Sequence, residues 1–183
     1  MDNVVLIGMP GCGKTTVGKW LARSLGMHFV DTDRVIEQQM QMPLSQILDE
    51  LGQEGFRETE NRICAGIEDH CAVIATGGSV VYGQEAMQHL RKIGVVVYLE
   101  VSEESLLLRL KDLHARGVTM SPGQSFSDLY AERCPLYKKW AHLILHTEGM
   151  SMKSVVDVLS RNLRKRLSLS ARNQAEPQAP VSE

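Results

Sequence analysis

Residues 8–15 read GMPGCGKT and satisfy GxxxxGK[ST], a pattern of glycine-rich loops that bind phosphate. The apolar run VVLIG (4–8) precedes the motif and a helical pattern over Lys14–Leu25 follows it, so the motif lies between a strand and a helix, as a phosphate loop requires. Its glycines let the backbone turn tightly and aim N–H groups inward, while the helix offers its positive end to a phosphate. This stretch predicts an α/β protein that binds a nucleoside triphosphate.

The residue types within the motif suit two tasks. Lys14 would bridge the β- and γ-phosphates of ATP, and the Thr15 hydroxyl would bind Mg²⁺. The alternative, a glycine turn that only caps a helix beneath a solvated Lys14, fits the placement of the motif less well. We interpret Cys12 as a small residue at a variable loop position rather than as a redox switch. The predicted nucleotide-binding residues of this stretch are Gly11, Cys12, Gly13, Lys14, Thr15 and Thr16.

Short runs rich in Val, Ile and Leu recur between longer stretches of helical periodicity. They are apolar throughout rather than alternating, which is typical of strands covered on both faces. This alternation predicts a three-layer α/β/α fold with a mostly parallel five-stranded sheet. The predicted strands are 4–8, 28–30, 72–76, 95–100 and 142–146. The clearest predicted helices are Lys14–Leu25, Gln53–Asp69, Glu103–Asp112, Phe126–Lys139 and Ser151–Leu167.

The length of 183 residues and a hydrophobic content of 43% indicate one domain with its own core, which we place at residues 1–167. The remaining segment, SLSARNQAEPQAPVSE (168–183), has few large apolar residues and is expected to be a disordered tail. The four cysteines have no CxxC spacing and indicate neither a zinc site nor a disulfide framework. The N-terminus fits neither a signal peptide nor a membrane span, so we expect a cytoplasmic protein.

The charge balance does not favour a polyanionic partner. With 20 basic and 22 acidic residues, the net charge of −2 gives no overall field for nucleic acid or an anionic membrane. The basic run RNLRKR (161–166) is interpreted as the solvated end of a helix, where basic residues favour the helix dipole. We therefore expect small-molecule ligands, no nucleic-acid or membrane partner, and a monomer.

Two acids, Asp31 and Asp33, end the second predicted strand. Open α/β sheets bind ligands at this carboxyl edge. Because alternate residues of an extended chain point in opposite directions, we assign one acid to the water shell of Mg²⁺ and the other to a second substrate. The alternative is that Asp33 is the N-cap of a helix that begins near Arg34.

Two further segments offer groups to the same edge of the sheet. Arg57, in EGFRETE (54–60), has a planar fork that suits a carboxylate, although an arginine between glutamates is more often part of a surface ion pair. Gly77 and Gly78 follow the third predicted strand. They would let a ligand lie against bare backbone N–H groups, or they form a plain turn.

Five motifs occur in the order and at about the spacings of the shikimate kinases, and the chain resembles this family from about Asn3 to Leu163. The resemblance implies a P-loop kinase fold with a lid. It also implies that ATP, with Mg²⁺, phosphorylates a hydroxyl of shikimate to give shikimate 3-phosphate, a step of aromatic amino acid biosynthesis. The motifs are GMPGCGKT (8–15), DTD (31–33), GFRETE (55–60), TGGS (76–79) and ERCPLY (132–137).

The resemblance further implies roles for single residues at the substrate end. Asp31 would help to organise Mg²⁺, and Asp33 would contact the diol of shikimate and is the candidate base. Arg57 and Arg133 would bind the substrate carboxylate. The backbone at Gly77–Gly78 would line the pocket.

The family's lid corresponds to about residues 113–125, LHARGVTMSPGQS. Arg116 would reach the transferring phosphoryl group from this lid, and Arg109 would approach the nucleotide. The chain departs from the family twice, because Ser79 replaces the last of three glycines and Arg-Pro-Leu-Leu of the lid reads RGVT (116–119). A serine would narrow the pocket or add a hydroxyl, and Gly117 would make the lid more flexible.

Two rival functions share the phosphate loop. One is a kinase for another hydroxy acid such as gluconate, and the other is a nucleotide-binding regulatory module without chemistry. The two arginines favour a carboxylated substrate, and the presence of every charged group that the chemistry needs favours an enzyme.

Overall fold

The computed structural model describes residues 2–109 and 123–175, with side chains described as far as residue 167. Within these residues the chain forms one sheet of five strands in the order β2-β3-β1-β4-β5, and every neighbouring pair is parallel. This confirms the predicted sheet. The strands are β1 (Asn3–Ile7), β2 (His28–Asp31), β3 (Ala72–Ala75), β4 (Gly94–Glu100) and β5 (Leu143–His146).

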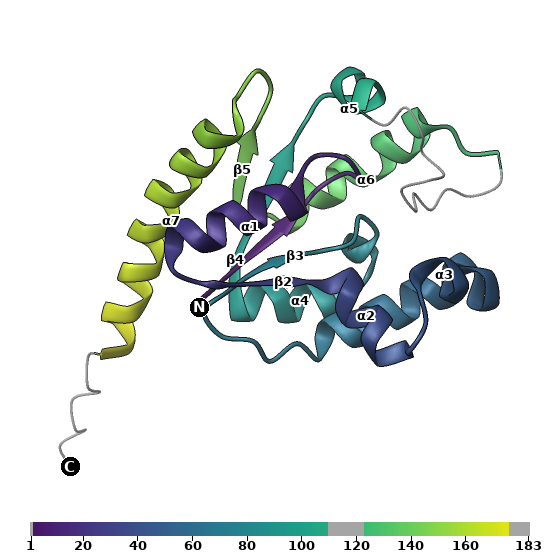
Figure 1. Ribbon diagram of the computed structural model, residues 1–183, viewed down its shortest axis with the longest axis horizontal. Coiled ribbons are helices and arrows are strands. Elements are labelled where there is room, and N and C mark those ends of the chain that lie inside the picture. The colour runs from purple at the N-terminus through teal and green to yellow at the C-terminus, as the bar shows by residue number, and fades with distance from the viewer. Residues whose placement is uncertain (1, 110–122, 176–183) are drawn as a thin grey trace, which may run out of the picture.

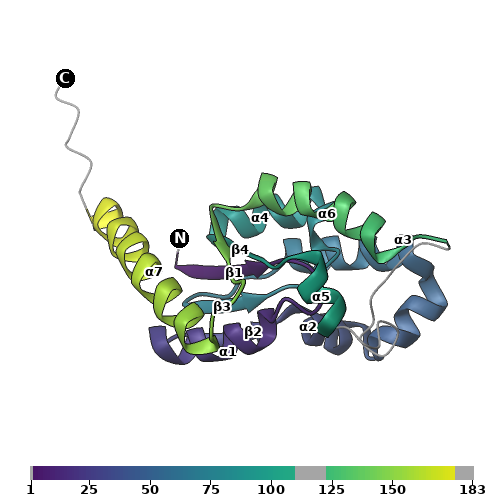
Figure 2. The ribbon, with the colours of Figure 1, turned by 90° about the horizontal axis from the view of Figure 1, so that it is seen from above.

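Helices cover both faces of this sheet and complete the predicted three layers (Figures 1 and 2). One face is covered by α1 and α7, which pack against each other, and the other by α4 and α6. α3 packs against both α2 and α4. The helices are α1 (Lys14–Leu25), α2 (Thr32–Met40), α3 (Leu44–Ala65), α4 (Gln84–Ile93), α5 (Glu103–Arg109), α6 (Phe126–Trp140) and α7 (Met152–Ala175), with a 3₁₀ turn η1 (Val80–Tyr82).

The burial of the strands follows from their order. Every residue of β1 and β3 is buried, and β4 is buried except at Glu100. The edge strands β2 and β5 are only partly buried. The runs 4–8, 72–76 and 95–100 therefore form strands covered on both faces, as predicted, whereas the expectation of full cover was wrong for 28–30 and 142–146, which form the two edges of the sheet.

The helix predictions were incomplete in four places. α2 and α4 were not among the predicted helices, and α3 begins at Leu44 rather than Gln53, with non-helical backbone at Gly52. α4 begins at Gln84 and its N-cap, Gly83, has no side chain that could cap the helix, so the usual start signal is missing from the sequence. α7 continues to Ala175, so the predicted tail cannot begin at residue 168. Residues 176–183 lie outside the described part.

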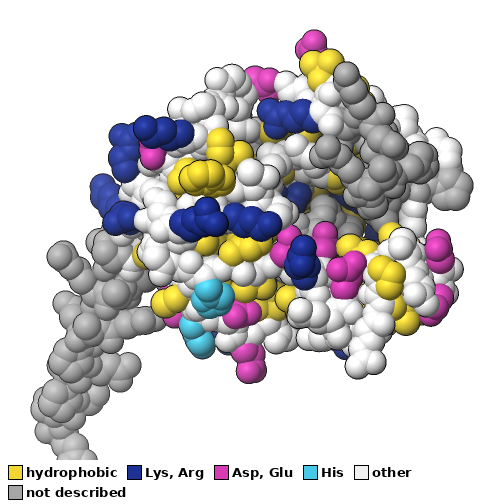
Figure 3. All heavy atoms as spheres, in the orientation of Figure 1, with side chains coloured by type: hydrophobic (Ala, Val, Ile, Leu, Met, Phe, Trp, Pro, Cys, Tyr) yellow, Lys and Arg dark blue, Asp and Glu magenta, His cyan; other side chains and the backbone are white. Residues whose placement is uncertain are grey.

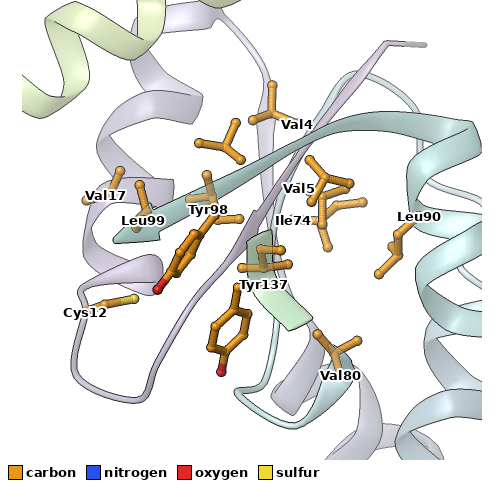
Figure 4. Packing of buried hydrophobic residues seen from close by; sticks show 14 of the residues in the cluster. Val4, Val5, Cys12, Val17, Ile74, Val80, Leu90, Tyr98, Leu99 and Tyr137 are labelled. Atoms are coloured by element: carbon orange, nitrogen blue, oxygen red, sulfur yellow. The ribbon is translucent and has the colours of Figure 1, made fainter. Parts of the chain in front are cut away.

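The main core surrounds the sheet (Figure 4). Tyr98 of β4 stacks on Tyr137 of α6 with 5.1 Å between ring centroids, which joins the sheet to α6. A second, smaller core consists of Ile36, Ile47, Phe56 and Ile63 and joins α2 to α3. Burying each such side chain contributes about 1.5–3 kcal/mol, so α2 and α3 form a unit with its own packing beside the ends of the strands. No helix in the described ranges is both long and apolar enough to cross a membrane.

Candidate active site

A cleft of about 600 Å³ lies at the carboxyl ends of β1, β2 and β3. Figure 3 shows a hollow on this side of the molecule with acidic and basic side chains at its edge. Open parallel sheets bind their ligands at this edge. The lining residues are Pro10, Gly11, Gly13, Lys14, Thr15, Thr16, Asp31, Asp33, Thr76, Gly77, Gly78 and Arg109.

The phosphate loop joins β1 to α1 and owes its shape to glycines in left-handed backbone. Gly11 and Gly13 have φ values of 80° and 99°, which L side chains rarely adopt. Gly13 is the N-cap of α1, and no side chain caps this helix end. The first N–H groups of α1 are therefore available to an anion in the cleft.

Lys14 is buried and its ammonium group lies over the loop. Its Nζ donates hydrogen bonds to the carbonyl oxygens of Gly8 at 2.7 Å and Met9 at 3.1 Å, and it lies 3.8 Å from Cys12 Sγ. A positive charge is thus held at the loop by backbone acceptors, at the point where phosphates would add negative charge.

Asp31 and Asp33 both line the cleft but have different partners. Asp31 ends β2 and accepts from Thr15 Oγ1 at 3.3 Å, which places two hard oxygen ligands side by side. The other Asp31 oxygen, Oδ1, accepts from the backbone N–H of Asp33 at 3.2 Å and caps α2. The suggestion that Asp33 is the cap was wrong, because Asp31 fills this role and Asp33 lies in the first turn of α2.

The Asp33 carboxyl has an altered acidity. Burial and the neighbouring Asp31 carboxylate raise its pKa to about 6, while Lys14 acts in the opposite direction. At neutral pH the group is mostly ionised but is a stronger base than an exposed aspartate, which suits a residue that accepts a proton.

A buried carboxyl group, Glu60 of α3, lies beside the segment that follows β3. Ser79 Oγ donates to Glu60 Oε2 at 2.5 Å, and Glu60 Oε1 has no hydrogen-bond partner among the described residues. Burial raises the pKa of Glu60 to about 7, although the Ser79 hydrogen bond lowers it. A Cβ atom at Gly77 would overlap Glu60 Oε1, so a larger residue at this point of the cleft wall would force the Glu60 carboxyl group to move.

Two arginines flank one aromatic ring beside the cleft. The Arg57 guanidinium carbon lies 4.1 Å from the Tyr82 ring centroid, and that of Arg133 lies 5.3 Å from the same centroid. Arg133 is buried, and its Nη1 would be 3.1 Å from a Cβ atom at Gly78. Gly78 lines the cleft beside Pro10 of the phosphate loop, so Arg133 lies directly behind the cleft wall at Gly78, and Arg57 shares the Tyr82 ring with it.

Comparison with known proteins identifies the family. The family model described as Shikimate kinase matches residues 10–164. A shikimate kinase of Thermodesulfovibrio yellowstonii is 38% identical over 168 residues, which cover 90% of this chain and 96% of the relative. The chain belongs to the shikimate kinase family.

Solved structures agree with this assignment. The shikimate kinase from Acinetobacter baumannii, determined in complex with shikimate, superimposes with a TM-score of 0.75 and 31% identity, covering 96% of both chains. A gluconokinase from Sinorhizobium meliloti 1021 has a TM-score of 0.56 and 17% identity, a likeness of fold alone. The predicted fold class and the predicted family are therefore confirmed.

The cleft brings together most residues that the sequence assigned to a shikimate kinase site. All of the predicted phosphate-loop residues except Cys12 line it, as do Asp31, Asp33, Gly77, Gly78 and Arg109. Cys12 is buried beneath the loop. Arg116 and most of the predicted lid lie outside the described residues. The roles of these residues remain predictions.

Three residues of the site were missed or misjudged when the sequence was interpreted. Glu60 follows Arg57 by three residues on α3, so helical spacing within GFRETE could have placed both on one face. Tyr82 belongs to no motif, so no sequence signal could have identified it. Ser79 does not line the cleft as expected of a residue that narrows it, because its hydroxyl is buried against Glu60.

Proposed function

We propose that this protein transfers the γ-phosphoryl group of ATP to a hydroxyl of shikimate and so forms shikimate 3-phosphate. The observation that carries the proposal is the layout of one cleft in a chain of the shikimate kinase family. The phosphate loop and Asp33 of the first turn of α2 line the cleft, and Arg57 and Arg133 meet at Tyr82 behind the cleft wall at Gly78.

The loop end suits the nucleotide. N–H groups at the start of α1 and the Lys14 ammonium would bind the phosphate oxygens, which spread the negative charge that develops during transfer. Thr15 and Asp31 would hold Mg²⁺, because this cation prefers hard oxygen ligands and keeps waters and phosphate oxygens in its remaining positions. When bound, Mg²⁺ would neutralise negative charge on the phosphate oxygens.

The opposite end suits a small hydroxylated acid. Arg57 and Arg133 would bind the carboxylate with paired N–H donors. The acid would lie against the backbone at Gly77–Gly78, where no side chain can intervene. Asp33 would orient the reacting hydroxyl and accept its proton, for which its pKa of about 6 is suited.

Two finer expectations belong to the same proposal. All four cysteines are free, which supports a reducing cytoplasm as the compartment. We also take the enzyme to act as a monomer. Light scattering during size-exclusion chromatography tests this point, and a dimer mass would contradict it.

A substrate panel tests the proposed reaction. ADP release is measured by a coupled assay with shikimate, with gluconate and without an acid, and the phosphorylated position is assigned by ³¹P–¹H correlation NMR. We expect turnover with shikimate and a product phosphorylated at the 3-hydroxyl. Turnover of gluconate without turnover of shikimate would identify gluconate, not shikimate, as the substrate. Nucleotide binding without any turnover would favour the regulatory module.

A further inference from the structure

Tyr82 is in contact with both arginines that border the cleft. Its ring lies 4.1 Å from the Arg57 guanidinium carbon and 5.3 Å from that of Arg133. Both distances are within the range of a cation–π interaction. One aromatic ring therefore lies within cation–π range of two guanidinium groups.

The Tyr82 hydroxyl connects the same cluster to a negative charge. It accepts a hydrogen bond from Arg133 Nε at 3.2 Å and donates one to Glu132 Oε1 at 2.7 Å. The other Glu132 oxygen accepts from Gln124 Nε2 at 2.8 Å. The burial of Tyr82 raises its pKa, so the hydroxyl keeps the proton that it donates to Glu132.

Arg57 depends on the ring more than Arg133 does. Arg57 Nε is buried and has no hydrogen-bond acceptor among the described residues. Among the described residues, the contact with the Tyr82 ring is thus the interaction that holds the Arg57 guanidinium group. A side chain with several rotatable bonds loses entropy when it binds a ligand, and less is lost if it is already held.

The backbone beneath Tyr82 is rigid. Val80 and Val81 of η1 are buried in the main core. The N–H of Tyr82 donates to Ser79 O at 3.0 Å, and Trp140 Nε1 donates to Val81 O at 3.1 Å. The ring is therefore presented from a fixed turn between α3 and α6, the helices that carry Arg57 and Arg133.

We propose that Tyr82 is the positioning residue of the carboxylate-binding pair, and that its ring and hydroxyl hold Arg57 and Arg133 in the orientation that one carboxylate requires. This rests on the proposed function, because it assigns the pair to the carboxylate of the acid substrate. Tyr82 acts through the arginines and does not itself contact the reacting atoms.

Two variants separate the ring from the hydroxyl. Tyr82→Leu removes both, and we expect the KM for shikimate to rise roughly tenfold. Tyr82→Phe keeps the ring and removes the hydroxyl, and we expect a rise of about threefold. The KM for ATP stays unchanged in both and kcat changes by less than about twofold, because neither variant touches the phosphate loop.

A ligand without the negative charge distinguishes positioning from general damage. Calorimetric affinities are measured for shikimate and for shikimate methyl ester. We expect the loss in Tyr82→Leu to appear with shikimate and to vanish with the ester, which the arginines cannot bind as an ion pair. Tyr130→Phe is the matched control, since its hydroxyl donates to Val101 O at 3.2 Å away from both arginines. Its shikimate affinity should equal that of the wild type.

The outcomes separate this inference from the proposed function. If the wild type binds shikimate but does not phosphorylate it, the proposed reaction fails and the Tyr82 titrations still decide the inference. If Tyr82→Leu binds shikimate as tightly as the wild type, or weakens acid and ester equally, the positioning role is overturned. If the wild type binds no shikimate, both are overturned.

Discussion

The phosphate loop and the acid-binding end of the cleft differ in the sequence distance that their contacts span. Lys14 bonds to carbonyl groups five and six residues away, and the loop owes its shape to its own glycines. In contrast, Ser79 reaches Glu60 across 19 residues and Arg133 reaches Tyr82 across 51. The first end depends on local backbone geometry, and the second depends on how α3, η1 and α6 pack. Substitutions at the two ends should therefore impair different properties of the enzyme.

The largest expected effect is at the loop. Lys14→Met removes the charge held over the phosphates, and we expect kcat to fall about 10³-fold with the shikimate affinity retained. A coupled ADP assay and a shikimate titration measure the two quantities. Lys19→Met, an exposed lysine on the same helix, is the control. A loss of shikimate binding in Lys14→Met would show that the two ends are not separable.

The acid-binding end should show the opposite pattern. Arg57→Ala removes one carboxylate partner, and we expect shikimate binding to weaken by about 2–5 kcal/mol while the affinity for an ATP analogue is unchanged. Calorimetry measures both. Arg62→Ala, an exposed arginine on α3, should leave both affinities unchanged. Unchanged shikimate affinity in Arg57→Ala would remove the carboxylate-binding role.

Glu60 allows a test through pH. Its folded pKa of about 7 lies above the ordinary 4.5, so between these values the folded state keeps a proton that the unfolded state has lost. Stability therefore falls as pH rises through this window, by about 3 kcal/mol in total. Glu60→Gln should lose this slope and be more stable than the wild type at pH 8, measured by urea unfolding at pH 5 and 8. Equal slopes in both proteins would refute the assignment.

The smallest expected effect concerns Ser79. Ser79→Ala removes the hydrogen bond that lowers the pKa of Glu60, so the pH window of Glu60 should shift upward. Stability at pH 8 should fall by about 1–3 kcal/mol, because a buried carboxylate loses a partner. The KM for shikimate should stay within about twofold, since Ser79 does not line the cleft. A large change in this KM would show that Ser79 contacts the substrate.

The same contrast explains what the sequence could predict. The phosphate loop is a contiguous motif whose glycines, lysine and threonine each have a local reason, so its position between β1 and α1 was predictable. The burial of β1, β3 and β4 was also predictable, because these strands consist of continuous apolar runs. α1 was predicted to the residue, since Gly26 ends it in left-handed backbone.

The acid-binding end could be predicted only in part. Arg57 alone looked like a surface charge, and a family resemblance was needed to pair it with Arg133, 76 positions further along the sequence. Tyr82 meets these arginines only because η1 is fixed between α3 and α6, which no local pattern reports. The missed helix α4 has buried residues on one face, but its glycine N-cap concealed its start.

Crossed calorimetric titrations test the central claim most directly. The wild type, Lys14→Met and Arg57→Ala are each titrated with a non-hydrolysable ATP analogue and with shikimate. The claim that one cleft has a nucleotide end and a separate carboxylate end predicts that Lys14→Met loses affinity for the analogue alone and Arg57→Ala for shikimate alone. If either variant loses both ligands, or if Arg57→Ala keeps shikimate at the wild-type affinity, the claim is contradicted.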